Sequence, residues 1–357
     1  MGKRFLIFSG HNDRAVVALC RFFAATDLPF SIIASGRQDA IHRTIWAAQV
    51  ILNRLDAVVS LDWMCALGDQ RSGPWIYCPT TEFINAFVLD NLEVLQGSGW
   101  EFSLPDKALY EGLTGKLSSQ AMIGSMKSGL LMPALQSMAF AHAPCVLKPI
   151  ANVSGGRVLY PLLCRTADEL VQALAGLDPT DYFAQDFIEG QSHYLCAHLS
   201  RQGEVAHFWQ TNLMQQAGGK SIVLARSGVN PGVDTTALLS RLVALGYHGP
   251  FMMEVIAAPD GVYYIEVNPR FWGPLQLALD VCPKILTLFA QDHGFEVSTP
   301  PSVAPQAGWY AWSYGAQQAG CLRLPAAQSL SASQLEQRLH THDVYARADT
   351  AALHDCH

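Results

Sequence analysis

Short apolar runs alternate along the first part of the chain with stretches whose apolar residues recur every three or four positions. Residues 4–9 have the pattern of a buried strand, and residues 15–26 have that of an amphipathic helix. A strand at 30–34, a helix at 41–55 and a strand at 57–61 are expected to follow. This β-α-β order predicts a small open parallel sheet of roughly 100 residues at the N-terminus.

The pattern changes after residues 97–99, Gly-Ser-Gly, where short strands separated by turns replace the alternation. Thr166 followed by Glu169 is the signature of a capping box at the start of a helix. Period-two stretches indicate hairpins, one of them turning at 201–203. Further helices are expected over 107–116, 166–176, 235–245 and 331–339. The second part of the chain is therefore predicted to be an α+β region with antiparallel sheets.

Length and composition restrict the class of protein. A chain of 357 residues predicts two or three domains, and 50% hydrophobic with 15% charged residues argues against disorder. The net charge of −7 argues against a general nucleic-acid binder. No apolar run approaches the roughly 20 residues that cross a bilayer, so no membrane partner is expected. Nine scattered cysteines without a C-x-x-C pair are typical of a reduced, cytoplasmic protein.

The most informative segment is FMMEVIAAPDGVYYIEVNPRFWG, which has the pattern of one antiparallel hairpin. Two β-type runs flank a three-residue loop at 259–261, with glycine where a left-handed conformation is wanted. If Ala258 pairs with Val262, counting outward places Glu254 directly opposite Glu266. The loop therefore predicts two carboxylates that face each other on neighbouring strands.

Facing carboxylates repel each other unless a cation lies between them. The period of two puts Asn268 on the same face as Glu266, and an all-oxygen set of two Glu and one Asn suits Mg²⁺ or Mn²⁺. Arg270 follows at the end of the strand, where its guanidinium can bind a phosphate or carboxylate with two hydrogen bonds. The alternative is a solvated sheet face that carries two unrelated glutamates.

A second group of residues has the chemistry of a phosphate site. Lys148 ends the apolar strand PCVLKP, a poor place for a solvated surface charge. The loop at 152–157 follows it, and Ser154, Gly155 and Gly156 allow backbone N–H groups to close over an anion. Taken alone, a Gly-Gly loop is only a turn, but a strand lysine leading into it favours a phosphate ligand.

Two other segments leave alternatives open. The strand that ends in Gln185, Asp186, Phe187 and Ile188 runs into a glycine turn and could supply the apolar slot and backbone edge that a purine needs. His193, His198 and His207 alternate with apolar residues across one hairpin; a zinc site is conceivable, and ordinary sheet histidines are the favoured interpretation. The turn after the first strand lacks G-x-G-x-x-G, which argues against a dinucleotide site.

The order of these features resembles the ATP-grasp superfamily, over roughly residues 1–300, and IEVNPRFWG is the most specific part of the resemblance. It implies an α/β parallel-sheet (pre-ATP-grasp) domain followed by an α+β ATP-grasp domain of two antiparallel-sheet subdomains. The expected boundaries are 1–105 for the first domain, 106–183 for a lid subdomain, 184–300 for the C-terminal subdomain with the metal hairpin, and 301–357 for a C-terminal extension.

The resemblance also implies roles for individual residues. Lys116 matches the lysine at the start of the lid, and Lys148 the one that touches the ATP phosphates. The adenine would contact Gln185, Asp186, Phe187 and Ile188, and Arg270 would steady the transferred phosphate. The metal, Mg²⁺ or Mn²⁺, would be held by Glu254, Glu266 and Asn268.

The activity that follows is that of an ATP-dependent carboxylate–amine ligase of the carbamoyl-phosphate-synthetase-like branch, which forms an acyl phosphate and then an amide, with release of ADP. Its partners would be a small-molecule carboxylate and an amine, and a homodimer is left open. Two alternatives are a bicarbonate-using carboxylase or carbamoylating enzyme and a non-catalytic nucleotide-binding module. The facing carboxylates count against the last, because a degenerate site has no need to retain them.

Overall fold

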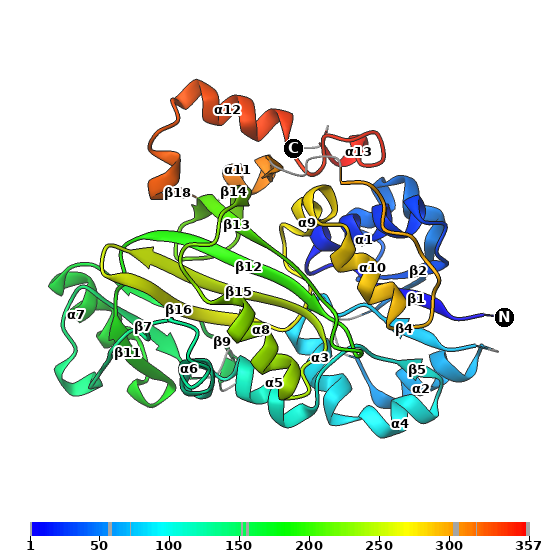
Figure 1. Ribbon diagram of the computed structural model, residues 1–357, viewed down its shortest axis with the longest axis horizontal. Coiled ribbons are helices and arrows are strands. Elements are labelled where there is room, and N and C mark those ends of the chain that lie inside the picture. The colour runs from blue at the N-terminus through cyan, green and yellow to red at the C-terminus, as the bar shows by residue number, and fades with distance from the viewer. Residues whose placement is uncertain are drawn as a thin grey trace.

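The structure is a computed structural model that describes residues 2–55, 59–71, 73–150, 153–154, 157–302, 307–318 and 320–354. The described chain contains a parallel sheet followed by antiparallel sheets (Figure 1), as the sequence predicts. The parallel sheet lies at one end of the molecule, and the antiparallel sheets lie at the other. The predicted fold class is confirmed.

The N-terminal sheet has the strand order β3-β2-β1-β4-β5, with all neighbours parallel. Its strands are β1 (Arg4–Phe8), β2 (Phe30–Ala34), β3 (Val50–Asn53), β4 (Trp75–Tyr77) and β5 (Trp100–Glu101). Its helices are α1 (Asp13–Ala25), α2 (Leu61–Asp69), α3 (Glu82–Asp90) and α4 (Leu92–Gly97).

The predicted helix over 41–55 is wrong. Two short 3₁₀ helices, η1 (Ala40–Arg43) and η2 (Ile45–Gln49), occupy its first part, and β3 follows at once. The side chains of Asp39 and Thr44 accept from the backbone N–H groups of Ile41 and Trp46, so each turn is capped separately. The strand expected at 57–61 is also misplaced, because Leu61 begins α2; residues 56–58 lie outside the described part.

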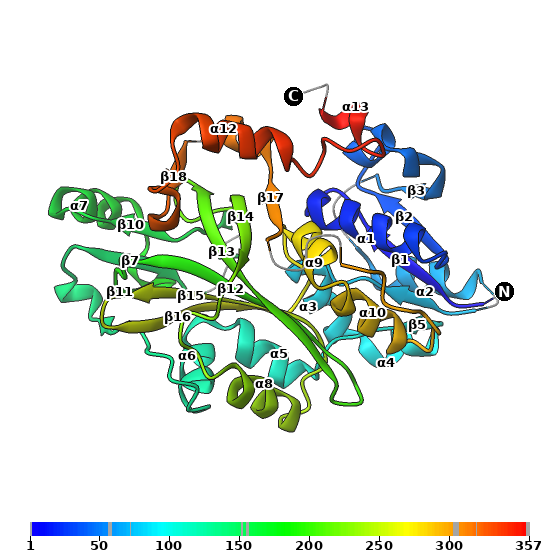
Figure 2. The ribbon, with the colours of Figure 1, turned by 45° about the horizontal axis from the view of Figure 1, so that its top comes forward.

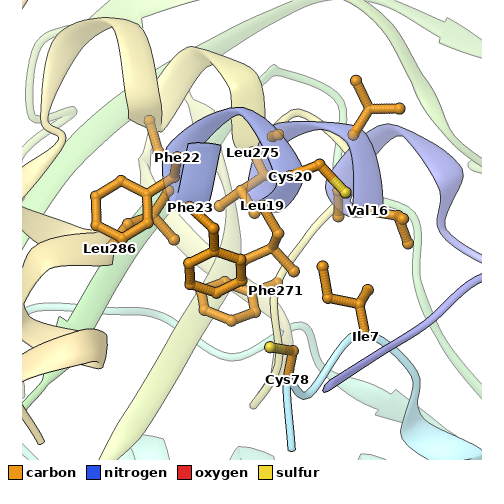
Figure 3. Close-up of a cluster of buried hydrophobic side chains, with 14 of the residues drawn as sticks. Ile7, Val16, Leu19, Cys20, Phe22, Phe23, Cys78, Phe271, Leu275 and Leu286 are labelled. Carbon is orange, nitrogen blue, oxygen red and sulfur yellow. The ribbon is translucent and has the colours of Figure 1, made fainter. Parts of the chain in front are cut away.

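A continuous hydrophobic core joins this sheet to a later part of the chain (Figure 3). The C-terminal side supplies Phe271 and two helices, α9 (Leu275–Val281) and α10 (Lys284–Gln291). Their side chains pack on α1, and Phe289 of α10 also reaches the sheet itself, with its ring centre 5.5 Å from that of Phe5 on β1. The buried residues labelled in Figure 3 are Ile7, Val16, Leu19, Cys20, Phe22, Phe23, Cys78, Phe271, Leu275 and Leu286. The N-terminal sheet is therefore held firmly against the chain that follows the predicted metal hairpin.

The lid is a four-stranded sheet of order β10-β7-β11-β6. Its strands are β6 (Leu135–Gln136), β7 (Cys145–Pro149), β10 (Leu162–Cys164) and β11 (Tyr182–Asp186), with the two-stranded pair β8 (Val153–Ser154) and β9 (Arg157–Val158) beside them in sequence. The helical elements within the range predicted as the lid are α5 (Lys107–Thr114), α6 (Lys116–Gly124), η3 (Met138–Phe140), α7 (Ala167–Gly176) and η4 (Pro179–Asp181). Of these, α5 and α6 pack against the large antiparallel sheet. The capping box predicted at Thr166 and Glu169 is present at the start of α7.

The large antiparallel sheet has the order β16-β15-β12-β13-β14-β17, and β18 pairs with β13. Its strands are β12 (Gln191–Leu199), β13 (Val205–Gln216), β14 (Ile222–Gly228), β15 (Gly249–Ala258), β16 (Gly261–Asn268), β17 (Trp309–Ala311) and β18 (Cys321–Arg323). The remaining helices are α8 (Thr235–Ala244), α11 (Ser313–Gln318), η5 (Pro325–Ala327), α12 (Ala332–Thr341) and α13 (Ala351–His354).

Strands β17 and β18 come from the predicted C-terminal extension, which therefore completes the same sheet that carries the hairpin (Figure 2). The domain boundaries themselves stay predictions. Within the described residues, none of the helices has both the length and the apolar character that crossing a membrane requires.

Candidate active site

The hairpin β15–β16 brings Glu254 opposite Glu266, as predicted, but by a different register. The loop has two residues, because Ala258 pairs with Gly261 and not with Val262. That register alone would shift the glutamates out of alignment. A β-bulge between Glu254 and Val255 inserts one extra residue on the opposite strand and restores the pair. The predicted pairing is therefore confirmed, and the predicted route to it is wrong.

The two carboxylates lie in an environment that disfavours a second negative charge. Glu254 is 9% exposed, and its Oε1 accepts a hydrogen bond from Ser192 Oγ at 2.7 Å. Burial, followed by the charge of Glu266, raises the pKa of Glu254 to about 7, while Ser192 and Lys148 act in the opposite direction. A cation between the carboxylates would remove this conflict. The donor set therefore fits a divalent metal with oxygen ligands.

Asn268 and Arg270 form a hydrogen-bonded chain with Glu266. Asn268 Nδ2 donates to Glu266 Oε1 at 2.8 Å, and Arg270 Nη2 donates to Asn268 Oδ1 at 3.0 Å. To act as a metal ligand, Asn268 would have to turn its Oδ1 away from Arg270. The same movement would free the guanidinium for an anionic ligand.

Lys148 joins the lid to the hairpin. Its Nζ donates to the backbone oxygen of Ile265 at 3.2 Å, and Ile265 is the residue that the bulge leaves unpaired in the strand register. Burial lowers the pKa of Lys148, and Lys116 lowers it further, while Glu266 and Glu254 raise it. The bulge therefore has two consequences: it aligns the glutamates and it exposes a carbonyl that holds the lysine between the two sheets.

A cavity of about 810 Å³ opens beside this group. Its wall contains four of the predicted site residues: Lys116, Glu266, Asn268 and Arg270. Lys116 is the first residue of α6, in the lid. Lys148, Glu254 and residues 185–188 lie outside the lining. The structure thus brings two cations, Lys116 and Arg270, together with the carboxylate of Glu266 at one cavity.

Another part of the wall comes from the parallel sheet, at the ends of β1 and β4. Asn12, after β1, donates through Nδ2 to the backbone oxygens of Thr80, after β4 (3.3 Å), and Phe271 (3.2 Å). Phe271 N in turn donates to Pro79 O at 2.8 Å. The chain order reverses between β1 and β4, which is where ligands bind in open α/β sheets. These bonds fix that edge against the end of the hairpin.

The predicted adenine segment has several protein contacts. Gln185 is buried and accepts from Gln120 Nε2 at 3.0 Å, and Asp186 accepts from Gln136 Nε2 at 2.7 Å. Phe187 is half-buried, with the Arg165 guanidinium 5.3 Å from its ring centre. The expected exposed strand edge is not found at Gln185 and Asp186, because β11 lies between β7 and β6 and is paired on both sides. Their side chains hold the strand in place, which leaves the half-buried Phe187 and Ile188 as the surface available to a base.

The glycine loop is only partly described. Ser154 ends β8 and pairs with Arg157 of β9, and Gly155 and Gly156 lie outside the described residues. The three hairpin histidines do not form a metal site: His193 contacts Thr211 and His198 contacts Asp292. Within the described chain, no group of three or more His, Cys, Asp or Glu side chains is placed to hold a metal.

Several cavity residues were missed by the sequence reasoning, which concentrated on the hairpin and the lid. They are His11, Asn12, Arg14, Thr80, Thr81, Glu82, Lys220 and Trp272. The signal for the first six was present, because they follow β1 and β4 of the predicted parallel sheet and the carboxyl ends of such strands line ligand sites. Trp272 lies within the motif IEVNPRFWG but was given no role, and Lys220 carries no comparable pattern.

The sheet order, the lid and the hairpin together define a protein with the ATP-grasp fold. No family model matches the sequence, and no curated protein matches it. Many solved structures match the fold. One is the biotin carboxylase domain of 2-oxoglutarate carboxylase from Hydrogenobacter thermophilus, in complex with MgADP, ADP and bicarbonate. Its TM-score is 0.61 and its identity 17%, over 82% of this chain and 70% of that chain.

Two further solved structures have a similar fold. Biotin carboxylase from Campylobacter jejuni has a TM-score of 0.60 and 13% identity, over 84% of this chain and 72% of its own. N5-carboxyaminoimidazole ribonucleotide synthetase from Thermus thermophilus has a TM-score of 0.60 and 17% identity, over 83% of this chain and 79% of its own. At these identities the likeness concerns the fold.

Proposed function

We propose that this protein is an ATP-dependent ligase that activates a carboxylate as an acyl phosphate and joins it to an amine. The observation that carries the proposal is the pair Glu254–Glu266 on a bulged hairpin, with Lys148 held against the bulge and Arg270 two residues beyond Asn268. Facing carboxylates, of which Glu254 is buried and Glu266 half-buried, beside cations are typical of a metal–phosphate site. The ATP-grasp fold and its MgADP-bound relative support the same assignment.

The nucleotide would lie between the lid sheet and the hairpin. Lys148 and Lys116 would contact its phosphates, and Ser154, Gly155 and Gly156 would close over them. Phe187 and Ile188, with the backbone beside Gln185 and Asp186, would face the adenine. Mg²⁺ or Mn²⁺ held by Glu254, Glu266 and Asn268 would neutralise charge on the phosphate oxygens.

In the first step, an oxygen of the substrate carboxylate attacks the γ-phosphorus, and the bond to the β-phosphate oxygen breaks to give ADP and an acyl phosphate. In the second, the amine attacks the acyl carbon, phosphate leaves, and the nitrogen loses a proton. Arg270 would stabilise the charge on the transferred group in both steps. No protein nucleophile is required, because phosphate replaces the poor oxide leaving group.

The test is the set of products formed from ATP with pooled carboxylic acids and amines. We expect ADP and phosphate, and their release should depend on both organic substrates. AMP and pyrophosphate would instead indicate adenylation and refute the acyl-phosphate route. A Glu266→Gln variant should lose turnover by orders of magnitude while remaining folded.

The second candidate is a bicarbonate-using carboxylase or carbamoylating enzyme, and one observation favours it. A structural relative named above is a biotin carboxylase domain solved with bicarbonate. ADP release that requires bicarbonate, and not an organic acid, would select this reaction. Binding of ATP without any turnover under both conditions would select the non-catalytic module.

A further inference from the structure

Arg14 lies in the wall of the same cavity, on the first turn of α1. Its Nη1 donates to Ile222 O at 3.2 Å and to Tyr310 Oη at 3.4 Å, and its Nη2 donates to Ser221 Oγ at 3.1 Å. Three of the five guanidinium N–H groups therefore have acceptors among the described residues, which leaves two free. All three acceptors are neutral.

No carboxylate forms an ion pair with Arg14 among the described residues. Its neighbour Asp13 accepts instead from Gly10 N at 3.1 Å. The guanidinium is therefore charged without a direct carboxylate contact, although the charge of Asp13 lies near enough for the two to interact. A fixed cation with no direct ion-pair partner in a cavity wall favours an anionic ligand.

The charges of the residues that line the cavity also favour an anionic ligand. Its wall carries four permanent cations, Arg14, Lys116, Lys220 and Arg270, and two carboxylates, Glu82 and Glu266. The whole chain has a net charge of −7, so this local excess of cations does not follow from composition. In the proposed function, Lys116 and Arg270 bind phosphate and Glu266 binds metal. Arg14 and Lys220 then remain for the other substrate.

Trp272 also contributes to this wall. Its side chain is 1% exposed, and its indole Nε1 is buried without a hydrogen-bond partner among the described residues. The next residue, Gly273, packs directly on Arg14, because a Cβ there would lie 2.8 Å from Nη2. The absence of a side chain at Gly273 therefore leaves room for the guanidinium at this wall.

The C-terminal extension holds Arg14 in place. The guanidinium carbon lies 4.0 Å from the ring centre of Trp312, and Tyr310 of β17 supplies the hydroxyl acceptor. Strand β17 pairs with the edge of β14 and lies beside α9 (Figure 2). Stacking and hydrogen bonding together fix the orientation of the guanidinium plane. A mobile surface arginine has no such fixed orientation.

We infer that Arg14 binds a second anionic group of the carboxylate substrate, so that this ligase acts on dianionic acids, such as dicarboxylates or phosphorylated acids. The inference rests on the proposed function and adds to it the class of the acid. One anionic group would be activated beside Arg270, and the other would be held by Arg14. Tyr310 and Trp312 are positioning residues that act through Arg14.

The test measures acid binding by titration calorimetry on the full chain, saturated with Mg²⁺ and a non-hydrolysable ATP analogue. The probes are three pairs of similar shape that differ in side-chain charge: aspartate and asparagine, glutamate and glutamine, phosphoserine and serine. The wild type should bind the anionic member of at least one pair about 10- to 100-fold more tightly, as expected for a charged hydrogen-bonded contact. Arg14→Gln should reduce that preference to within a fewfold, and Arg14→Lys should give an intermediate value.

Arg71→Gln is the matched control, because Arg71 also stacks on a tryptophan, 4.1 Å from the ring centre of Trp75, away from the cavity. It should leave the preference unchanged. Trp312→Leu should lower the preference without changing affinity for the ATP analogue, which a general loss of structure would not do. The inference is overturned if no pair shows a charge preference in the wild type, or if the preference survives in Arg14→Gln. Failure of the proposed function appears separately, as absence of analogue binding or of ADP release.

Discussion

Replacing Glu254 with glutamine should make the metal-free protein more stable at alkaline pH. The pKa of Glu254 rises from 4.5 to about 7 on folding, chiefly through burial and then through the charge of Glu266. A raised carboxyl pKa means that the folded state binds the proton more tightly than the unfolded state. The free energy of unfolding of the metal-free protein therefore falls as pH rises from about 4.5 to about 7, and the whole loss is present above that range.

The size of the effect follows from that difference in pKa. Each unit of difference in pKa between the folded and unfolded states corresponds to about 1.36 kcal/mol. The loss of stability is therefore about 3 kcal/mol above pH 7 and less than about 1 kcal/mol at pH 5. Glutamine carries no charge and keeps an oxygen that can accept from Ser192 Oγ. The gain of Glu254→Gln over the wild type should thus grow by about 2.5 kcal/mol between pH 5 and pH 8.

The measurement is urea unfolding followed by tryptophan fluorescence at both pH values, in the presence of a chelator. Glu336→Gln, on the exposed face of α12, is the control for loss of one surface charge. Adding Mn²⁺ at pH 8 should stabilise the wild type and have a smaller effect on Glu254→Gln, because the metal binds best between two carboxylates. An equal gain at pH 5 and pH 8 would show that the charge of Glu254 is not the source of the effect.

Three further predictions concern the site and the fold. Arg270→Lys keeps the charge but loses the two-pronged geometry, so turnover should fall at least about 10-fold while the dissociation constant for ATP changes little. An equal loss of turnover and of ATP affinity would contradict the assigned role. The hydrogen bond from His293, at 3.1 Å, and then Lys3 lower the pKa of Glu101 to about 2. Glu101→Gln should therefore lower the unfolding free energy at pH 7 by about 1 kcal/mol. The difference from the wild type should disappear as pH falls from 4.5 toward 2, and acid unfolding curves would test this. Phe271→Ala removes a fully buried ring from the core of Figure 3 and should lower the free energy of unfolding in urea by about 3–5 kcal/mol. A loss below about 1 kcal/mol would show that Phe271 does not couple the N-terminal sheet to the chain that follows the hairpin.

Elements whose signals are local could be predicted from the chain alone. The alternation at the N-terminus predicted the parallel sheet, and Thr166 with Glu169 predicted the start of α7. The apolar setting of Lys148 predicted a buried lysine, which is 8% exposed. These features follow from the spacing of neighbouring residues, so they can be read without knowing what packs against them.

The assembly of the site depends instead on tertiary packing. The loop predicted a register that was off by one, and a bulge restored the glutamate pair and presented the Ile265 carbonyl to Lys148 from another sheet. The wall with Arg14 depends on residues about 300 positions apart in the chain, Arg14 on α1 and Tyr310 on β17. Such contacts arise because a shared core presses the sheet, the hairpin and the extension together, and no periodicity in the sequence encodes that packing.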